Sequence, residues 1–232
     1  MRKGALFSLF LLALPAVATA RTPVLVELYT AQGCASCGEA DAYAAKLSER
    51  SGVLMLTFPV DYWDYLGWPD TFAKPEFSER QKAYVARLAL REPYTPQVIV
   101  DGRAEAPGLK PARVDKLVRD AGRAARNPPD VRFVGSRRVD VGLGRSPSGG
   151  ADVWLIRYAP HPQDVMVKTG DNRGRTVVQK NVVKEIKRLG RWRGRPQAFR
   201  LPKASEEGLE MAVIIQAPKG GRVLAVGQPR KD

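Results

Sequence analysis

Apolar positions in residues 22–126 follow two alternating periods. Short apolar runs at 22–30, 53–60 and 96–103 have the length of buried strands. Segments 37–50, 76–91 and 111–126 instead repeat their apolar positions every three to four residues, as amphipathic helices do. Strands that alternate with helices predict an α/β layer in this half of the chain.

Beyond residue 130 the pattern changes to short β-rich runs separated by Gly, Pro and Asn. Such spacing predicts an antiparallel sandwich or barrel. Segment 180–190 fits a helix through Val182, Ile186 and Leu189, but its paired valines and its β-rich surroundings favour a strand. The β-rich runs lie at 131–134, 151–159, 163–169, 209–217 and 222–228.

Charge divides the chain at the same place. Residues 21–125 carry 14 basic and 14 acidic side chains, whereas residues 126–232 carry 22 basic and 10 acidic ones. The change falls at "RNPPD", residues 126–130, where paired prolines also stop a helix. We therefore predict an α/β domain over residues 21–126 and a basic β-rich domain over 130–232.

The first 20 residues have the form of a secretory signal peptide. Arg2 and Lys3 precede an apolar stretch, and Ala18-Thr19-Ala20 supplies the small residues of a cleavage site. The apolar core is too short for a settled transmembrane helix, and no later stretch is long and apolar enough to cross a membrane. We expect cleavage after Ala20, no stable transmembrane segment afterwards, and a periplasmic or secreted protein in an oxidising compartment.

Both cysteines of the chain, Cys34 and Cys37, lie in "YTAQGCASCGEAD". As a purely structural disulfide, so short a loop would stabilise the folded protein by only about 2 kcal/mol, because it restricts the unfolded chain very little. A structural zinc site usually takes four cysteine and histidine ligands, and the single histidine, His161, lies in the other half of the chain. Two thiolates could still hold monovalent copper. The third interpretation is a redox pair, which needs neither a metal nor another cofactor.

The surrounding sequence favours the redox pair. An apolar strand leads into a turn, Cys34 stands where the next helix should begin, and Cys37 lies one turn inside it. Helix N-terminal N–H groups stabilise an anion, so Cys34 would be the attacking thiolate and Cys37 the shielded, resolving thiol. Thioredoxin-fold proteins also place a cis-proline before a strand that faces the cysteine pair, and Thr95-Pro96 in "YTPQVIVDG" has this form. We predict a cis bond there, with Thr95 and Pro96 docking an extended substrate segment.

Four strings together resemble the secreted thioredoxin-like proteins of domain-of-unknown-function family 1223: "VELYTAQGCASCGEAD", "VDYWDYLGWPDTFAKPEFSERQKAY", "YTPQVIVDG" and "DNRGRTVVQKNVVKEIKRLGRW". The resemblance implies an α/β thioredoxin-like N-terminal domain followed by an all-β, sandwich or barrel-like, C-terminal domain, and it implies no particular substrate. Glu27 resembles the buried acid that relays a proton to the resolving thiol in thioredoxins. Many family members carry prolines where this chain has Gly38-Glu39, and often a histidine where it has Pro59.

Two further segments have open interpretations. Aromatic residues in "DYWDYLGWPD", residues 61–70, would either frame the cysteines or seal the loop onto the core. The densest basic cluster would either contact an anionic surface or remain solvated. An exported protein does not meet nucleic acid, so we exclude that partner. The basic cluster comprises Lys180, Lys184, Lys187, Arg188, Arg191, Arg193 and Arg195.

These patterns favour an exported thiol–disulfide oxidoreductase or redox partner protein that acts on protein thiols or disulfides. Its predicted catalytic residues are Cys34, Cys37, Pro96, Thr95 and Glu27. Two alternatives stay open at this point. One is a non-catalytic extracytoplasmic binding module, and the other is a copper-handling protein that uses the same cysteine pair.

Overall fold

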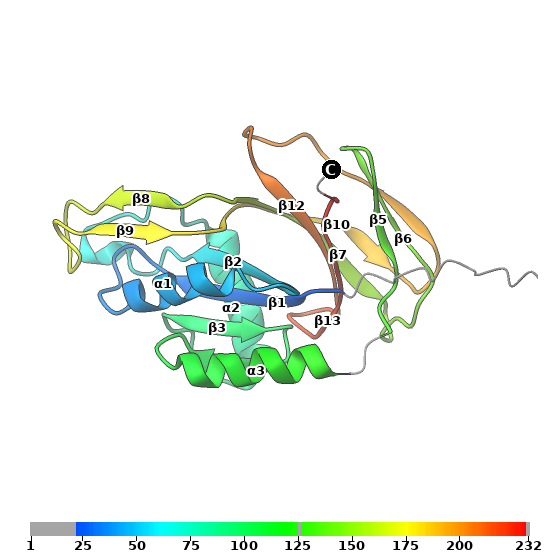
Figure 1. Ribbon diagram of the computed structural model, residues 1–232, viewed down its shortest axis with the longest axis horizontal. Helices are drawn as coiled ribbons and strands as arrows, with labels where there is room; N and C mark the ends of the chain where they lie inside the picture. The colour runs from blue at the N-terminus through cyan, green and yellow to red at the C-terminus, as the bar shows by residue number, and fades with distance from the viewer. Residues whose placement is uncertain (1–21, 125–126, 231–232) are drawn as a thin grey trace, which may run out of the picture.

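The computed structural model describes residues 22–124 and 127–230 (Figure 1). The predicted signal peptide, residues 1–20, lies outside the described residues. In the first half of the chain the predicted strands and helices are confirmed to within a few residues at their ends. The elements are β1 (Val24–Thr30), α1 (Cys37–Leu47), β2 (Val53–Pro59), η1 (Asp64–Leu66), α2 (Pro75–Arg87), β3 (Gln97–Val100), β4 (Ala104–Pro107) and α3 (Pro111–Arg123).

The second half is built from strands, and the ambiguous segment after residue 180 is one of them, as predicted. Three short strands, β6, β9 and β11, were not predicted, because four-residue segments such as "RVDV" and "QAFR" hold too few apolar residues to show a period. The elements are β5 (Val131–Val134), β6 (Arg138–Val141), β7 (Ala151–Ala159), β8 (Gln163–Met166), β9 (Thr176–Gln179), β10 (Val182–Trp192), β11 (Gln197–Arg200), β12 (Glu210–Gln216) and β13 (Val223–Gly227).

The expected fold class, an α/β thioredoxin-like domain followed by a separate all-β domain, is wrong. The described residues form a mostly β structure whose largest sheet has eight strands in the order β13-β12-β7-β10-β2-β1-β3-β4. Strands from both halves of the chain therefore belong to one mixed sheet, in which β1 and β2 are parallel and β1 and β3 are antiparallel. Two small sheets, β11-β6-β5 and β8-β9, complete the strands of the described chain.

The physical reason lies at the edge of β2. The strand is buried along nearly its whole length, so its free side could not be left with unpaired backbone groups. β10 closes it: Val182 pairs with Thr57, the Thr57 N–H donates to the carbonyl of Asn181 at 3.0 Å, and the Asn181 side-chain amide donates to the carbonyl of Met55 at 2.8 Å. The change of composition near residue 130 falls between α3 and β5, the first strand of the small β11-β6-β5 sheet, and the predicted domain boundary there stays a prediction.

Both faces of the large sheet are covered. Val26 and Leu28 of β1 belong to a core that α1 and α3 complete on one face. Leu25 and Tyr29 point to the opposite face, where Phe77 and Tyr84 of α2 pack. A third core joins the small β11-β6-β5 sheet to β7, β12 and β13. The β8–β9 hairpin extends from the sheet beside α1, at the left of Figure 1. No helix in the described ranges is both long and apolar enough to cross a membrane.

Candidate functional site

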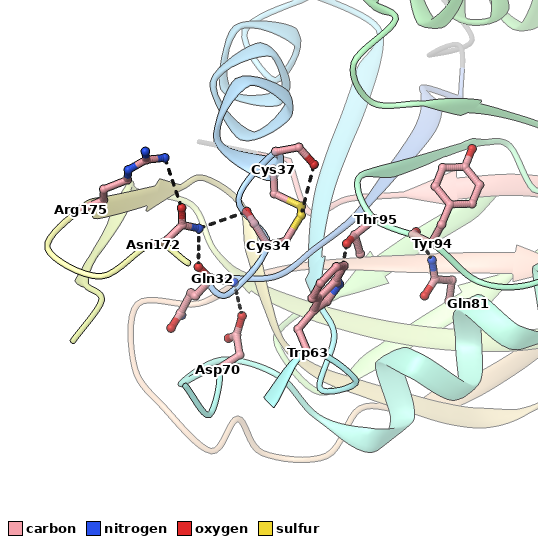
Figure 2. Close-up of a disulfide and its surroundings, with 11 residues drawn as sticks. Gln32, Cys34, Cys37, Trp63, Asp70, Gln81, Tyr94, Thr95, Asn172 and Arg175 are labelled. Carbon is pink, nitrogen blue, oxygen red and sulfur yellow. Dashed lines mark hydrogen bonds between the residues drawn. A yellow bond between two sulfur atoms is a disulfide. The ribbon is translucent and has the colours of Figure 1, made fainter. Parts of the chain in front are cut away.

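The two cysteines form a disulfide where the chain leaves β1 and enters α1 (Figure 2). Their Cα atoms are 5.4 Å apart. Both residues are buried, at 2% exposure for Cys34 and 1% for Cys37, yet Ala35 and Ser36 between them are exposed. The disulfide therefore lies directly beneath a short, exposed turn.

The helix begins at Cys37, as the apolar pattern predicts, and not at Cys34, where the redox interpretation places its start. α1 starts at Cys37, and residues 34–37 form a turn in which the Cys37 N–H donates to the carbonyl of Cys34 at 3.1 Å. Cys34 thus precedes the helix rather than opening it. The predicted difference in shielding is also not visible in the exposed fractions, which are nearly equal. Which cysteine attacks stays a prediction.

The Thr95–Pro96 bond is cis, as predicted. Gly108 lies between Pro96 and the cysteine helix α1, and its N–H donates to the Pro96 carbonyl at 2.8 Å. A Cβ at Gly108 would lie 2.9 Å from the Cβ of Pro96 and 2.9 Å from that of Ala40, so only glycine fits between them. Ala40 is one helical turn after Cys37. The proline segment and the start of α1 are therefore packed together.

Glu27 occupies a different setting from the one that its predicted proton-relay role suggests. Its carboxylate accepts a hydrogen bond from the buried Arg80 guanidinium at 2.6 Å and another from Tyr84 at 2.5 Å. Arg80 also donates to Gln216 of β12 at 3.1 Å. None of the hydrogen bonds in the described chain joins Glu27 to a cysteine. The structure thus places Glu27 in a buried charged network between both halves, and its catalytic role stays a prediction.

The loop between β2 and α2 frames the cysteine turn. The Asp70 carboxylate accepts the Gln32 backbone N–H at 2.7 Å, and the Trp68 indole donates to the Gln32 side chain at 2.9 Å. The Trp63 indole donates to the Thr95 hydroxyl at 2.7 Å (Figure 2). Burial raises the pKa of Asp70, although backbone N–H groups stabilise its charged form. This loop fixes both the segment before Cys34 and the segment before Pro96.

Sequence reasoning missed Asn172, which comes from the second half of the chain. The turn between β8 and β9 brings its buried side chain to the cysteine turn, where the amide donates to the carbonyl of Gln32 at 2.8 Å and to that of Cys34 at 3.1 Å (Figure 2). The residue stands in "DNRGRT", a string that carried the family resemblance. The spacing of residues along the chain could not predict that Asn172 contacts Cys34, which lies 138 positions earlier.

Sequence reasoning also missed Asp41. It lies four residues after Cys37, so both side chains belong to the same side of α1. The carboxyl is 3% exposed, and neither oxygen has a hydrogen-bond partner among the described residues; buried polar atoms of Thr30 and Gln179 are likewise unpaired. Burial raises the pKa of Asp41 to about 8, and the neighbouring Thr30 and Gln179 lower it only in part. The four-residue spacing between Cys37 and Asp41 was the sequence feature that could have indicated this placement.

Residues considered for metal binding or surface contact lie elsewhere. His161 is exposed, and the described ranges hold no group of three or more His, Cys, Asp and Glu side chains placed to bind a metal. The predicted basic cluster is partly neutralised by the fold. Lys180 pairs with Glu49, Arg188 pairs with Asp152 at 2.7 Å, and the Lys184 ammonium lies 3.6 Å from the centre of the Phe72 ring.

Comparisons with known proteins found two similar solved structures and one family model. A crystal structure of protein AGR_C_4864 from Agrobacterium tumefaciens is similar over 93% of this chain and 100% of that chain, with 30% identity and a TM-score of 0.72. HBP35 of Porphyromonas gingivalis is similar in fold over 91% of this chain and 76% of that chain, with 13% identity and a TM-score of 0.62. No curated protein matches the chain. The family model described as "Protein of unknown function (DUF1223)" matches residues 25–216, so the chain belongs to the DUF1223 family.

Proposed function

We propose that this protein is an exported thiol–disulfide oxidoreductase whose redox centre is the Cys34–Cys37 pair. The observation that carries the proposal is the placement of this disulfide, which is buried beneath the exposed Ala35-Ser36 turn at the start of α1. A buried structural staple would not need an open turn above it. The composition of residues 1–20 supports cleavage after Ala20 and a periplasmic or secreted location.

The chemistry is two successive exchange steps. A partner thiolate attacks the Cys34 sulfur, so that a mixed disulfide forms and Cys37 leaves as a thiolate that takes up a proton. A second partner thiol then loses its proton and attacks the partner sulfur of that mixed disulfide, which releases Cys34. The partner dithiol is oxidised by two electrons to a disulfide, and the Cys34–Cys37 disulfide is reduced by two electrons to a dithiol. The same steps in reverse reduce a partner disulfide.

The start of α1 supports Cys34 as the attacking group. Ser36, the residue before the helix, makes no side-chain cap in the described structure, so the first N–H groups of α1 are available to stabilise a thiolate on the preceding turn. Both cysteines pack into the core that Phe58 and Phe77 share, so burial does not distinguish them. In the proposal, Cys34, which precedes the helix, meets the partner, and Cys37, which begins the helix, resolves the mixed disulfide.

Two neighbouring groups complete the proposed site. Thr95 and Pro96 end a segment that Trp63 and Gly108 hold against the cysteine helix, and an extended partner segment would dock there. Asp41 offers a proton: its pKa of about 8 keeps the buried carboxyl protonated at neutral pH, one helical turn from Cys37. We propose that this proton meets the thiolate that Cys37 forms as a leaving group.

Trapping with single-cysteine variants tests the proposal. When Cys37→Ser is mixed with a peptide disulfide, Cys34 should attack it and remain joined to one peptide cysteine as a mixed disulfide, because no resolving thiol remains. Cys34→Ser, which lacks the same disulfide and so serves as the matched control, should accumulate little. After reduction of the unmodified protein, iodoacetamide near neutral pH should alkylate Cys34 much faster than Cys37. Equal trapping and equal alkylation of the two cysteines would overturn the proposal.

A further inference from the structure

We infer that the turn between β8 and β9, residues 167–175, is a basic recognition element that selects partners with acidic residues beside their reactive cysteine. We call residues 167–175 the hairpin tip. The inference rests on the proposed exchange function and names the class of partner that the site takes. It assigns a role to a segment from the second half of the chain that the redox chemistry itself does not require.

The hairpin tip is fixed against the cysteine turn. Asn172, at 5% exposure, donates to the carbonyls of Gln32 and Cys34. Thr169 donates to the carbonyl of Gly67 in the loop after β2, and a Cβ at Gly170 would lie 3.4 Å from the carbonyl of Leu66. The tip is thus held by both loops that surround the disulfide. Its exposed side chains keep a defined position beside the path of a partner.

The exposed side chains of the tip are mainly basic. Lys168, Arg173 and Arg175 are all exposed, against one exposed acid, Asp171. The Arg175 guanidinium lies 3.5 Å from the Asn172 side-chain oxygen, and the Asn172 amide in turn donates to the Cys34 carbonyl (Figure 2). The Asn172 side chain therefore links the charge of Arg175 to the cysteine turn. None of the ion pairs in the described ranges includes any of these three cations. Their charge is therefore available to a partner.

Acidic groups also surround the cysteines, but they differ in kind. Asp70 is buried and already accepts backbone N–H groups, and Asp64 accepts the N–H of Asp70 at 3.0 Å. Glu39, in the first turn of α1, is the exposed acid beside Cys37. The exposed charges that the hairpin tip and the start of α1 present near Cys34 are therefore the three cations and Asp171 of the tip and the Glu39 carboxylate.

This arrangement favours an extended, acidic partner segment. Opposite charges accelerate encounter and suppress unsuitable partners more than they add affinity, and their effect weakens as salt screens them. Cations beside Cys34 also stabilise its thiolate once the disulfide opens. The source of selectivity is then the second half of the chain, whereas the reacting sulfurs belong to the first.

The test compares two peptides of equal length with one cysteine each, one flanked by Asp and Glu and the other by Lys, as thiols that open the Cys34–Cys37 disulfide of the mature protein. At low ionic strength the acidic peptide should react on the order of tenfold faster. Lys168→Glu with Arg173→Glu should remove or reverse this preference. Arg193→Glu with Arg195→Glu is the matched control, because both pairs are exposed and change the net charge equally, while the second pair lies beyond β10.

Three outcomes would overturn the inference, and they are distinguishable. If the unmodified protein reacts equally with both peptides, or if both double variants change the preference equally, the hairpin tip does not select the partner, although the exchange function stands. If neither peptide opens the disulfide, the proposed function fails and the inference fails with it. Retention of the preference by the control variant alone, and its loss at high salt, would support the inference.

Discussion

The two halves of the chain differ in what they contribute to one site. Residues 22–124 supply the disulfide, the cis-proline segment and the three α-helices of the described structure, and they carry 13 basic and 14 acidic side chains. Residues 127–230 supply strands, an excess of basic residues, and Asn172. The comparison shows that the half without cysteines still contributes to the surroundings of the disulfide, because Asn172 donates hydrogen bonds to the cysteine turn of the other half.

The halves are joined by buried polar contacts as well as by strand pairing. Arg80 bridges Glu27 of β1 and Gln216 of β12, and the rings of Tyr84 and Trp154 lie 5.3 and 5.7 Å from the Arg80 guanidinium carbon. Such a network is stable only when every charge in it is paired. The four predictions below each change one buried residue that lies between the halves or within the first half.

The largest effect is expected for Glu27→Gln. It leaves the Arg80 guanidinium buried without its carboxylate, which should lower the free energy of unfolding by about 3–5 kcal/mol. Urea unfolding with the disulfide intact measures this change. Glu79→Gln is the control, because Glu79 and its partner Lys82 are both exposed and such an ion pair contributes about 1 kcal/mol or less. Equal losses in the two variants would show that the Arg80 network does not hold the halves together.

Asp41→Asn should change how stability depends on pH. The pKa of Asp41 is about 8 in the folded protein against the ordinary 3.8, so between these values the folded state holds one more proton than the unfolded state. Stability from this group is therefore complete below about pH 4 and is lost as pH rises through about 8, at up to about 1.4 kcal/mol per pH unit.

Asparagine cannot ionise, so the variant should be the more stable protein at pH 8, and its advantage should shrink by several kcal/mol toward pH 5. Urea unfolding at the two pH values gives this difference. Asp120→Asn is the control, because Asp120 is exposed on α3. An identical pH dependence in the unmodified protein and in Asp41→Asn would refute the assignment of a buried, protonated acid between α1 and β9.

Gly108→Ala tests a contact within the first half. The added methyl group would meet Pro96 and Ala40 at 2.9 Å each, so the proline segment must move away from α1, at a cost of about 1–3 kcal/mol. Exchange with a peptide disulfide should slow as well, whereas Gly122→Ala, whose Cβ would meet only Val24 at 3.8 Å, should leave it unchanged. If Gly108→Ala is destabilised but its exchange rate is unchanged, Pro96 does not take part in partner docking.

Asn172→Ala should have the smallest effect on stability. It removes two hydrogen bonds from the second half to the cysteine turn, a loss of about 1–2 kcal/mol. Hydrogen exchange should become faster at residues 31–36 and 167–175, while the helix α3 keeps its protection. Gln163→Ala, in the same hairpin but bonded only to neighbouring carbonyls, is the control. Unchanged protection of the cysteine turn would show that the hairpin tip does not hold it.

Much of the local structure was predictable from the sequence because it depends on neighbours along the chain. The strand before the cysteines and the three helices follow from apolar periods and from turn residues, whereas the cis bond before Pro96 was expected from the place of a cis-proline in thioredoxin-fold proteins. The apolar pattern placed the start of α1 at Cys37, as observed, whereas the redox interpretation placed it at Cys34, where the chain instead forms a turn that joins the Cys37 N–H to the Cys34 carbonyl. The separation into an α/β and an all-β domain was wrong, because strand pairing depends on which edges are exposed in space.

The sequence by itself determined that the chain has one pair of cysteines in a strand–turn–helix context, a basic second half and a β-rich C-terminal segment. Only the tertiary structure decided that β10 lies beside β2, that Glu27 pairs with Arg80, and that Asn172 reaches the carbonyl of Cys34. The physical reason is that periodicity reports which residues seek burial, whereas the partner of a buried polar group is chosen by the fold that brings distant segments together.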